Sequence, residues 1–150
     1  MRVWRLSTPL FPPLTGDGAR IAGGRWNSPG MPMVYASGHL ALAVLEMLVH
    51  FNPGELPEML MAYEIEVPAA AVEMLDLSML APGWRATVER TRSIGDQWLR
   101  ERRSLALGVP SVVVPSAPER NILLNPLHKA AQHLTIISSE AFTFDERLRR

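Results

Sequence analysis

The stretch GGRWNSPGMPMVYAS, residues 23–37, contains the chain's only Gly-Gly pair, placed directly before Arg25 and Trp26. Glycines and prolines are typical of any surface loop, and in that interpretation Arg25 belongs to a turn before an edge strand. A phosphate or nucleotide site uses the same residues differently, because glycines let the backbone approach a ligand and a guanidinium pairs with phosphate oxygens. The stretch alone leaves both interpretations open.

Short strands and two helices are expected on either side of this stretch. Strands are predicted at 3–6, 33–36, 60–67, 109–115, 133–138 and 141–144, and helices at 38–50 and 84–106, the second broken near 93–95. Ser37 is placed to cap the first helix, which is apolar nearly all round and is expected to be buried on most sides. Without repeats or linkers, the pattern predicts one α+β domain over residues 1–150.

The composition excludes several classes of function. The chain has 150 residues, 47% of them hydrophobic, and a formal net charge of zero, so no global field favours nucleic acid or an anionic membrane. The absence of cysteine excludes disulfides and thiolate chemistry. No apolar run approaches the roughly 20 residues of a membrane span, and no signal peptide opens the chain, so we expect a cytoplasmic protein.

Of the 15 basic residues, all but Lys129 are arginine. This usage fits a GC-rich genome, and it also fits phosphate binding, for which the planar guanidinium is the better shaped cation.

Glu46 is the most prominent polar residue in the first helix. At about 100° per residue, His39, Glu46 and His50 form one polar stripe on an otherwise apolar helix. Such a stripe is either a helix edge in contact with water or the wall of a cleft, where the carboxylate needs a partner. A metal site is not predicted, because no HExxH or comparable third-ligand spacing is present.

A third cluster, VPSAPERNILLNPLH, occupies residues 114–128. Ser116 follows the strand predicted at 109–115, where ligand-binding loops commonly attach. Asn125 and Pro126 have the pattern of a helix N-cap followed by proline, and a short helix starting there would offer N–H groups to an anion. The serine-hydrolase elbow, the P-loop and the dinucleotide fingerprint are all absent from the sequence.

Taken in order, GGRWNSPGMPMVYAS, ALAVLEMLVH and VPSAPERNILLNPLH resemble the RES domain family, the toxin half of bacterial RES–Xre toxin–antitoxin pairs. The likeness extends to the opening VWRL and the C-terminal strands, so it covers essentially the whole chain. The family's last motif often reads N-P-x-H-P, whereas Lys129 follows His128 here. We expect that departure to alter the turn rather than the site.

The resemblance implies an ADP-ribosyltransferase-like fold, a split β-sheet core with flanking helices, and consumption of NAD⁺ as a substrate without a cofactor. It assigns the catalytic roles to Arg25, Tyr35, Glu46 and Ser116. The binding set that it implies is Arg5, Arg25, Trp26, Asn27, Tyr35, Ser116 and Asn125.

Three activities remain open within the resemblance: cleavage of NAD⁺ by hydrolysis or phosphorolysis, ADP-ribosylation of a protein, and a catalytically silent binding role. The implied partner is an Xre-type helix-turn-helix antitoxin, which would contact DNA in place of this neutral chain. The resemblance also allows a homodimer within the toxin–antitoxin complex.

Overall fold

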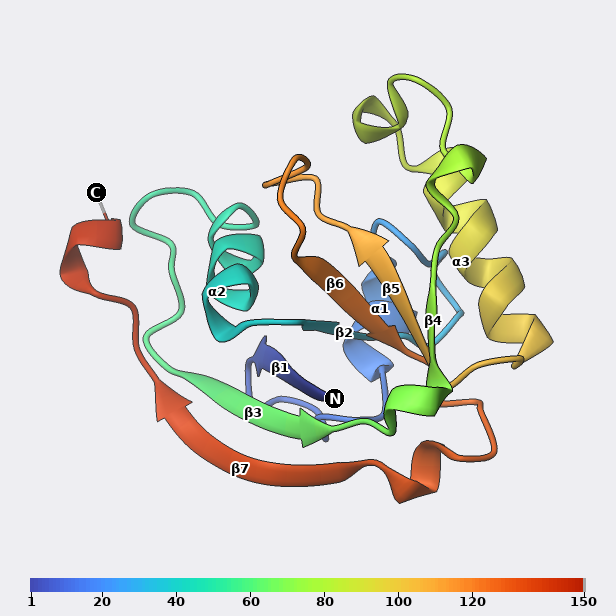
Figure 1. Ribbon diagram of the computed structural model, residues 1–150. Helices are drawn as coiled ribbons and strands as arrows, with labels where there is room; N and C mark the ends of the chain where they lie inside the picture. The colour runs from blue at the N-terminus through green and yellow to red at the C-terminus, as the bar shows by residue number, and fades with distance from the viewer. Residues whose placement is uncertain (150) are drawn as a thin grey trace.

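A computed structural model describes residues 1–149, which form a seven-stranded mixed sheet with helices on its faces (Figure 1). The strand order is β4-β5-β6-β2-β1-β3-β7, and only the β4–β5 pair is parallel. The main elements are β1 (Arg2–Ser7), α1 (Asp17–Ala22), β2 (Val34–Ser37), α2 (Leu40–Leu48), β3 (Leu60–Glu66), β4 (Val72–Met74), α3 (Glu89–Glu101), β5 (Ala106–Pro110), β6 (Arg120–Leu124) and β7 (Thr135–Phe142). The 3₁₀ helices are η1 (Ala69–Ala71), η2 (Leu77–Met79), η3 (Trp84–Ala86), η4 (Ala131–His133) and η5 (Glu146–Arg149).

The sheet consists of two halves that are joined at one point. Strands β4, β5, β6 and β2 form one half, and β1, β3 and β7 form the other. Between the halves, β1 and β2 are in register only at Trp4 and Ser37, whereas β1 and β3 pair over their whole length. The halves diverge from that junction in Figure 1, and residues on both sides of it line the cleft described below. The α+β class predicted from the sequence is confirmed.

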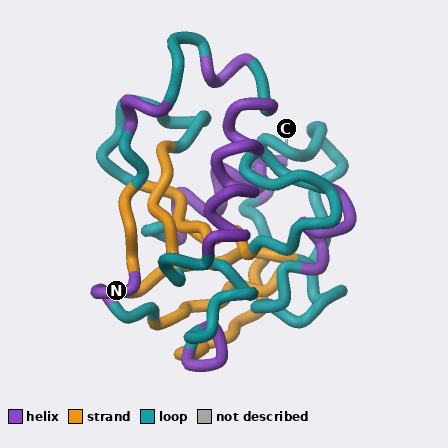
Figure 2. The backbone as a smooth tube through the Cα atoms, turned by 90° about the vertical axis from the view of Figure 1, so that its right-hand side faces the viewer, coloured by secondary structure: helices purple, strands orange, loops and turns teal. Residues whose placement is uncertain are grey.

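The core follows from strand alternation, because successive side chains of a strand point to opposite faces. On β6, Ile122 and Leu124 join the cluster that links the two half-sheets, while Leu123 points to the opposite face and packs with Trp98 of α3. Helix α3 therefore covers one half-sheet, as Figures 1 and 2 show from two directions. Helix α2 packs on the other half through Ala43, against Leu6 and Leu60.

Helix α2 differs from its prediction in two ways. Ser37 does not cap it: the serine hydroxyl donates to Asn121 Oδ1 at 2.7 Å, and the N-cap is His39, without a side-chain cap bond. The helix is also less buried than expected, because only Leu42 and Ala43 are buried and Val49 is 59% exposed. Glu46 and His50 of its polar stripe, with part of its apolar surface, face the cleft described below, whereas His39 stacks on Trp4.

The boundaries of the other elements also differ from those predicted. Helix α3 begins at Glu89 and continues through Gly95 without a break, then ends where Arg102 adopts a left-handed conformation. Strand β5 ends at Pro110, so the apolar run that follows is a loop, and the two predicted closing strands are one strand, β7. No helix starts at Asn125, because its side chain instead closes a turn by accepting from Leu127 N at 2.9 Å.

None of the helices within residues 1–149 has the length and apolar character needed to cross a membrane.

Candidate functional site

A cleft of about 870 Å³ lies beside the junction of the two half-sheets. Ligand sites commonly have volumes of about 300–1,000 Å³, so this cleft has room for a small organic ligand. Its walls come from β1, β2, α1, α2, the loop before β2 and the connection from β5 to β6. The polar and charged residues that line it are Arg5, Ser7, Thr8, Arg25, Tyr35, Ser37, Glu46, His50 and Asn121.

Glu46 is held by two hydrogen-bond donors that lie far from it in the sequence. Ser111 Oγ and Asn121 Nδ2 both donate to Glu46 Oε1, each at 2.6 Å. Ser111 is itself fixed, because its Oγ accepts from Val113 N at 3.0 Å and from Val114 N at 3.1 Å. Within residues 1–149, Oε2 of Glu46 receives no hydrogen bond, so one carboxylate oxygen is anchored and the other is available to a ligand.

Arg5 provides positive charge at the junction between the half-sheets. One guanidinium nitrogen donates to the Tyr35 carbonyl at 2.9 Å, while Nε is buried and has no hydrogen-bond partner among residues 1–149. Burial lowers the pKa of Arg5, yet an arginine keeps its charge in proteins. No carboxylate forms an ion pair with it in the described chain, so an anionic ligand in the cleft would pair with this half-buried cation.

Arg25 lines the same cleft from the loop before β2, and α3 holds that loop in place. Thr91 Oγ1 donates to the Arg25 carbonyl at 2.6 Å, and Arg92 Nε donates to the Gly24 carbonyl at 2.8 Å. The Arg25 side chain donates to the Thr87 carbonyl at 3.1 Å and forms no ion pair in the described chain. Its charge is therefore also available to an anion.

Tyr35 forms part of the cleft wall, and its hydroxyl fastens the loop that carries Arg25. The hydroxyl accepts from Trp26 N at 2.9 Å and donates to Asn27 Oδ1 at 2.7 Å. Burial raises the pKa of Tyr35 above its ordinary value, so the phenol stays protonated at neutral pH. A Cβ at Gly24 would lie 2.4 Å from this hydroxyl, which explains why one of the paired glycines is needed there.

The structure places four of the sequence-predicted residues differently from expectation. Ser116 lies in an exposed turn after β5 and is absent from the cleft lining, because the strand ends at Pro110 rather than Pro115. Asn27 is fully buried: its amide donates to the carbonyls of Ala19 and Met31, so it shapes the loop and does not line the cleft.

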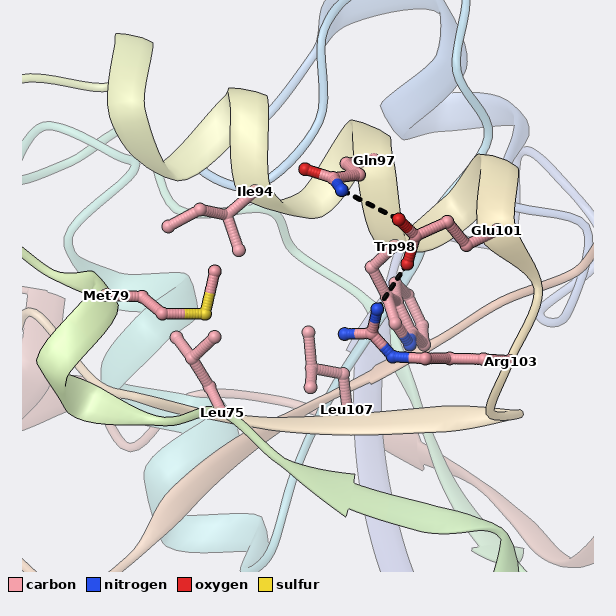
Figure 3. Close-up of a pocket in the computed structure, with 8 residues that line it drawn as sticks. All are labelled: Leu75, Met79, Ile94, Gln97, Trp98, Glu101, Arg103 and Leu107. Carbon is pink, nitrogen blue, oxygen red and sulfur yellow. Dashed lines mark hydrogen bonds and ion pairs between the residues drawn. The ribbon is translucent and has the colours of Figure 1, made fainter.

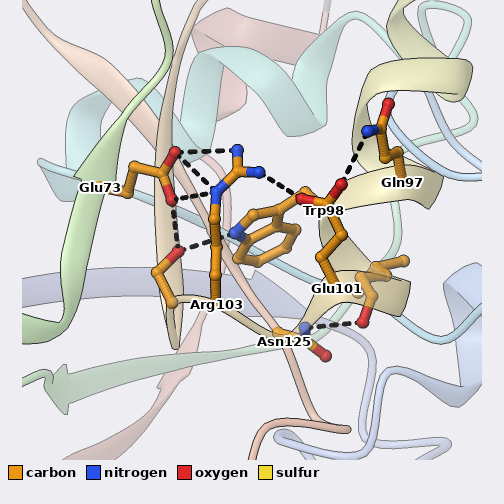
Figure 4. A network of polar contacts seen from close by, with 8 residues as sticks. Glu73, Gln97, Trp98, Glu101, Arg103 and Asn125 are labelled. Carbon is orange, nitrogen blue, oxygen red and sulfur yellow. Dashed lines mark hydrogen bonds and ion pairs between the residues drawn. The ribbon is translucent and has the colours of Figure 1, made fainter.

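Trp26 lines the cleft, but its side chain is 2% exposed and packs in the core beneath α3, so it offers no open face for stacking. Asn125 is also completely buried and lies outside the cleft lining, where it donates to the Leu99 carbonyl at 3.1 Å (Figure 4). The structure does bring Arg5, Arg25, Tyr35 and Glu46 together around one cleft.

Ser111, Asn121 and Ser37 contribute to the site but were not among the predicted functional residues. The sequence contains a signal for Ser111, because it is a polar residue inside the apolar run 105–115 and follows a proline just as Ser116 does. Asn121 and Ser37 carry no comparable local signal. They meet only because β2 and β6 pair in a register that sets Ser37 opposite Asn121.

A second, much smaller cavity of about 50 Å³ lies between α3, β5 and the segment after β4 (Figure 3). Arg103 beside it binds both carboxylate oxygens of Glu73 and also contacts Glu101 (Figure 4). The hydrogen bond from Arg103 lowers the pKa of Glu73. This network connects β4 to the end of α3 and is separate from the residues that line the large cleft.

Within the described chain, no group of three or more acidic or histidine side chains is arranged to hold a metal ion. The cleft therefore combines one anchored carboxylate with two arginines, an arrangement suited to an anionic ligand that develops positive charge during a reaction.

Comparison with known proteins identifies the family. The RES domain model matches residues 2–145, and the chain belongs to the RES family. The "Prs ADP-ribosylating toxin" of Sphingobium sp. is 40% identical, with 98% of this chain and 96% of the relative covered. "Toxin Res" of Pseudomonas putida is 39% identical, with 99% of both chains covered. The fold resembles a chain in the crystal structure of the M. tuberculosis MbcT–MbcA toxin–antitoxin complex, with a TM-score of 0.71, 20% identity, and 99% of this chain and 88% of that chain covered.

Proposed function

We propose that this protein is the toxin of a toxin–antitoxin pair and that it cleaves NAD⁺ at the bond between nicotinamide and ribose. The observation that carries the proposal is the placement of Glu46, anchored through one oxygen, in the same cleft as Arg5, a half-buried arginine without an ion-pair partner in the described chain. A dinucleotide supplies the anionic pyrophosphate for the arginine and the reacting sugar for the carboxylate.

The chemistry needs little beyond these side chains. As nicotinamide leaves as a neutral molecule, positive charge develops on the ribose carbon and ring oxygen. The free oxygen of Glu46 stabilises this oxocarbenium character by electrostatics and can orient the attacking group. Water as the attacking group gives ADP-ribose and a proton. Inorganic phosphate as the attacking group gives ADP-ribose with a phosphate on the carbon that carried nicotinamide.

Arg5 and Arg25 serve as the proposed pyrophosphate contacts. Each lines the cleft and neither forms an ion pair with a carboxylate of the described chain. Tyr35 is proposed as a wall of the nucleotide pocket, in contact with the ligand through its ring, since its hydroxyl proton is committed to Asn27.

Transfer of ADP-ribose to a protein is the second candidate function, and it uses the same site. It is favoured by the relative from Sphingobium, which is named an ADP-ribosylating toxin and is 40% identical over nearly the whole chain. The first steps are shared, and the two activities differ in whether a protein side chain or a small molecule attacks the ribose.

The proposed partner is an antitoxin of the Xre helix-turn-helix type that covers the cleft and binds DNA on behalf of the pair. The similar fold in the MbcT–MbcA complex supports a partner of the antitoxin class. A cytoplasmic location is proposed because that is where the protein would meet the cell's NAD⁺. A homodimer within the toxin–antitoxin complex is also proposed.

The deciding experiment measures NAD⁺ loss and nicotinamide release by the purified chain, with and without phosphate, beside Glu46→Gln and Arg5→Met. We expect rapid loss by the wild type and a decrease of at least about 100-fold in Glu46→Gln, because the variant cannot offer a negative charge to the oxocarbenium ion. A requirement for phosphate identifies phosphorolysis.

Folded wild-type protein that leaves NAD⁺ untouched in both buffers would contradict the cleavage proposal. Incubation of labelled NAD⁺ with a cell lysate then tests the second candidate. Label on a protein band that is absent with Glu46→Gln supports transfer, and its absence argues against both enzymatic functions.

A further inference from the structure

Glu46 belongs to a hydrogen-bonded chain of four side chains, which runs from Ser37 through Asn121 and Glu46 to Ser111. Ser37 on β2 donates to Asn121 on β6, Asn121 donates to Glu46 on α2, and Ser111 after β5 donates to Glu46 from the other side. Two segments, β6 and the segment after β5, thus meet at the carboxylate that α2 carries, and β2 supports one of them through Ser37. Ser37 and Ser111 are 3% and 1% exposed, so water competes little for these bonds.

The direction of the hydrogen bond from Ser111 is fixed by its backbone neighbours. Val113 N and Val114 N both donate to Ser111 Oγ, and a backbone N–H cannot accept. The hydroxyl proton of Ser111 is therefore directed to the remaining partner, Glu46 Oε1. This contact requires an acceptor at Oε1, so a proton on the glutamate could reside only on Oε2.

The direction of the hydrogen bond between Asn121 and Glu46 follows from the two ends of the Asn121 amide, one a donor and the other an acceptor. With Nδ2 toward Glu46, Oδ1 faces Ser37 and accepts its hydroxyl proton at 2.7 Å. The reversed amide would place an oxygen 2.6 Å from the carboxylate oxygen, which repels it when Glu46 is ionised. The Glu46 carboxylate thus selects this amide orientation, and Ser37 hydrogen-bonds the other end of the same amide.

We propose that Asn121, held in place by its hydrogen bond with Ser37, is the positioning residue of Glu46: its amide fixes Oε1 and leaves Oε2 free for the ligand. The effect of Asn121 on turnover rests on the proposed function, whereas its hydrogen bonds to Glu46 and Ser37 do not. Asn121 acts through Glu46 rather than on the ribose, so its removal should affect turnover more than NAD⁺ binding.

Replacing Asn121 by aspartate tests this idea with almost no change in shape. The aspartate keeps an acceptor for Ser37, and at acid pH it can lend a shared proton to Glu46 as the amide does. At higher pH two carboxylates face each other, and like charges at such a distance do not ionise together without a large cost. The variant's turnover should therefore fall as pH rises, in a range where the wild type does not fall.

Other charged groups near Glu46 are unchanged by this substitution. Arg5 from β1, Arg25 from the loop before β2 and His50 from α2 line the same cleft. Arg120 precedes Asn121 on β6 and donates to carbonyls of its own loop, such as that of Ala117 at 3.0 Å. Because these groups are common to the wild type and the variants, a new pH dependence reports on position 121.

The experiment compares kcat and KM for NAD⁺ from pH 5 to pH 9 in the wild type, Asn121→Asp, Ser37→Ala and Gln132→Glu. Gln132→Glu adds the same charge on exposed η4, outside the cleft lining. We expect Asn121→Asp to lose about 100-fold in kcat at pH 8 with KM within about threefold, and to recover at least about tenfold of that deficit at pH 5. Ser37→Ala should lose about three- to tenfold at every pH, and Gln132→Glu should match the wild type.

An Asn121→Asp profile parallel to that of the wild type, whatever its level, would overturn the proposal, since a merely structural defect gives a loss independent of pH. If the wild type does not act on NAD⁺, the proposed function fails but the positioning role is still tested. Urea unfolding should then show that the free energy of unfolding of Asn121→Asp falls relative to the wild type as pH rises from 5 to 8, because two facing carboxylates repel each other, while Gln132→Glu shows no such trend. A difference between Asn121→Asp and the wild type that stays constant with pH would contradict the positioning role.

Discussion

At the residue scale, two serines in similar sequence contexts have very different environments. Ser111 and Ser116 each follow a proline at the end of an apolar run, yet Ser111 is buried against Glu46 and Ser116 lies in an exposed turn. The distinction matters because Ser111 donates to a carboxylate, and bonds of this kind contribute about 1.5–3 kcal/mol.

We therefore predict that Ser111→Ala lowers NAD⁺ cleavage by about 10- to 100-fold, since each 1.4 kcal/mol corresponds to about tenfold in rate. Ser116→Ala should stay within about twofold of the wild type. Both variants are compared in the nicotinamide-release assay after a check of the melting temperature. A larger loss in Ser116→Ala than in Ser111→Ala would restore the assignment expected from the sequence.

Tyr35 provides a second test at this scale, through stability rather than activity. Its hydroxyl has two partners, Trp26 N and Asn27 Oδ1, so Tyr35→Phe leaves both unsatisfied and should cost about 1–3 kcal/mol at neutral pH. Burial raises the pKa of Tyr35 in the folded state above the ordinary tyrosine value of about 10. A raised folded-state pKa gives stability that is complete below the unfolded value and is lost as pH rises above it.

Above about pH 10 the wild-type protein should accordingly lose stability faster than Tyr35→Phe. The difference in the free energy of unfolding between the two proteins should therefore become smaller. Urea unfolding of the two proteins at pH 7, 10 and 11 measures this gap. A gap that stays constant over the three pH values would mean that the tyrosine hydroxyl is not the group responsible.

At the element scale, helix α3 is defined by its contacts with the loop before β2. Thr91, Arg92 and Asp96 bind Arg25, Gly24 and Ser28, respectively. Gly95 allows this close approach, because a Cβ there would lie 1.7 Å from the Trp26 carbonyl oxygen. The sequence favours a helix break at Gly95, whereas the structure uses the glycine for packing.

Gly95→Ala should therefore destabilise the protein by about 2–3 kcal/mol, although alanine is the better helix former by about 1 kcal/mol. Gly18→Ala in α1 is the matched control, because its Cβ would meet Phe11 at an ordinary 3.7 Å. That variant should be neutral or slightly more stable in urea unfolding. Equal effects at the two positions would show that the contact with Trp26 can relax.

At the scale of the whole molecule, the cleft exists because the sheet is split. A single register pair joins β1 to β2, and Arg5 occupies the junction with a buried, unsatisfied Nε. Closing the sheet completely would fill this space with strand pairs. The fold thus keeps a half-buried cation without an ion-pair partner in the described chain beside the cleft, where an anionic ligand can pair with it.

Binding of NAD⁺ should therefore raise the melting temperature of the Glu46→Gln variant, which is expected to bind NAD⁺ without cleaving it. Ligand at about 100 times its Kd contributes about 2.7 kcal/mol, which corresponds to a rise of about 5–10 °C for a chain of this size. Adding Arg5→Met should remove most of the rise, and adding Arg147→Met, an exposed arginine with Asp145 as its partner, should preserve it. A full rise with Arg5→Met would exclude Arg5 as an anion contact.

The sequence by itself determined the α+β class and, through a resemblance of its motifs, the family. It also predicted Arg5, Arg25, Tyr35 and Glu46 as site residues, and the structure places all four around one cleft. Arg25 and Glu46 stood out through local patterns, a glycine pair before an arginine and a polar stripe on an apolar helix, whereas the resemblance assigned Arg5 and Tyr35. A local pattern also explains the wrong prediction that Ser37 caps helix α2, because a serine before a helix is usually a cap.

Only the tertiary structure decided which groups hold Glu46. Ser111 and Asn121 reach it across 65 and 75 residues of sequence, and Ser37 reaches Asn121 across 84. It also showed that Trp26, Asn27 and Asn125, which the sequence predicted as binding residues, are buried. The physical reason is that strand register and the point where a strand ends depend on long-range pairing and burial, which local periodicity does not encode.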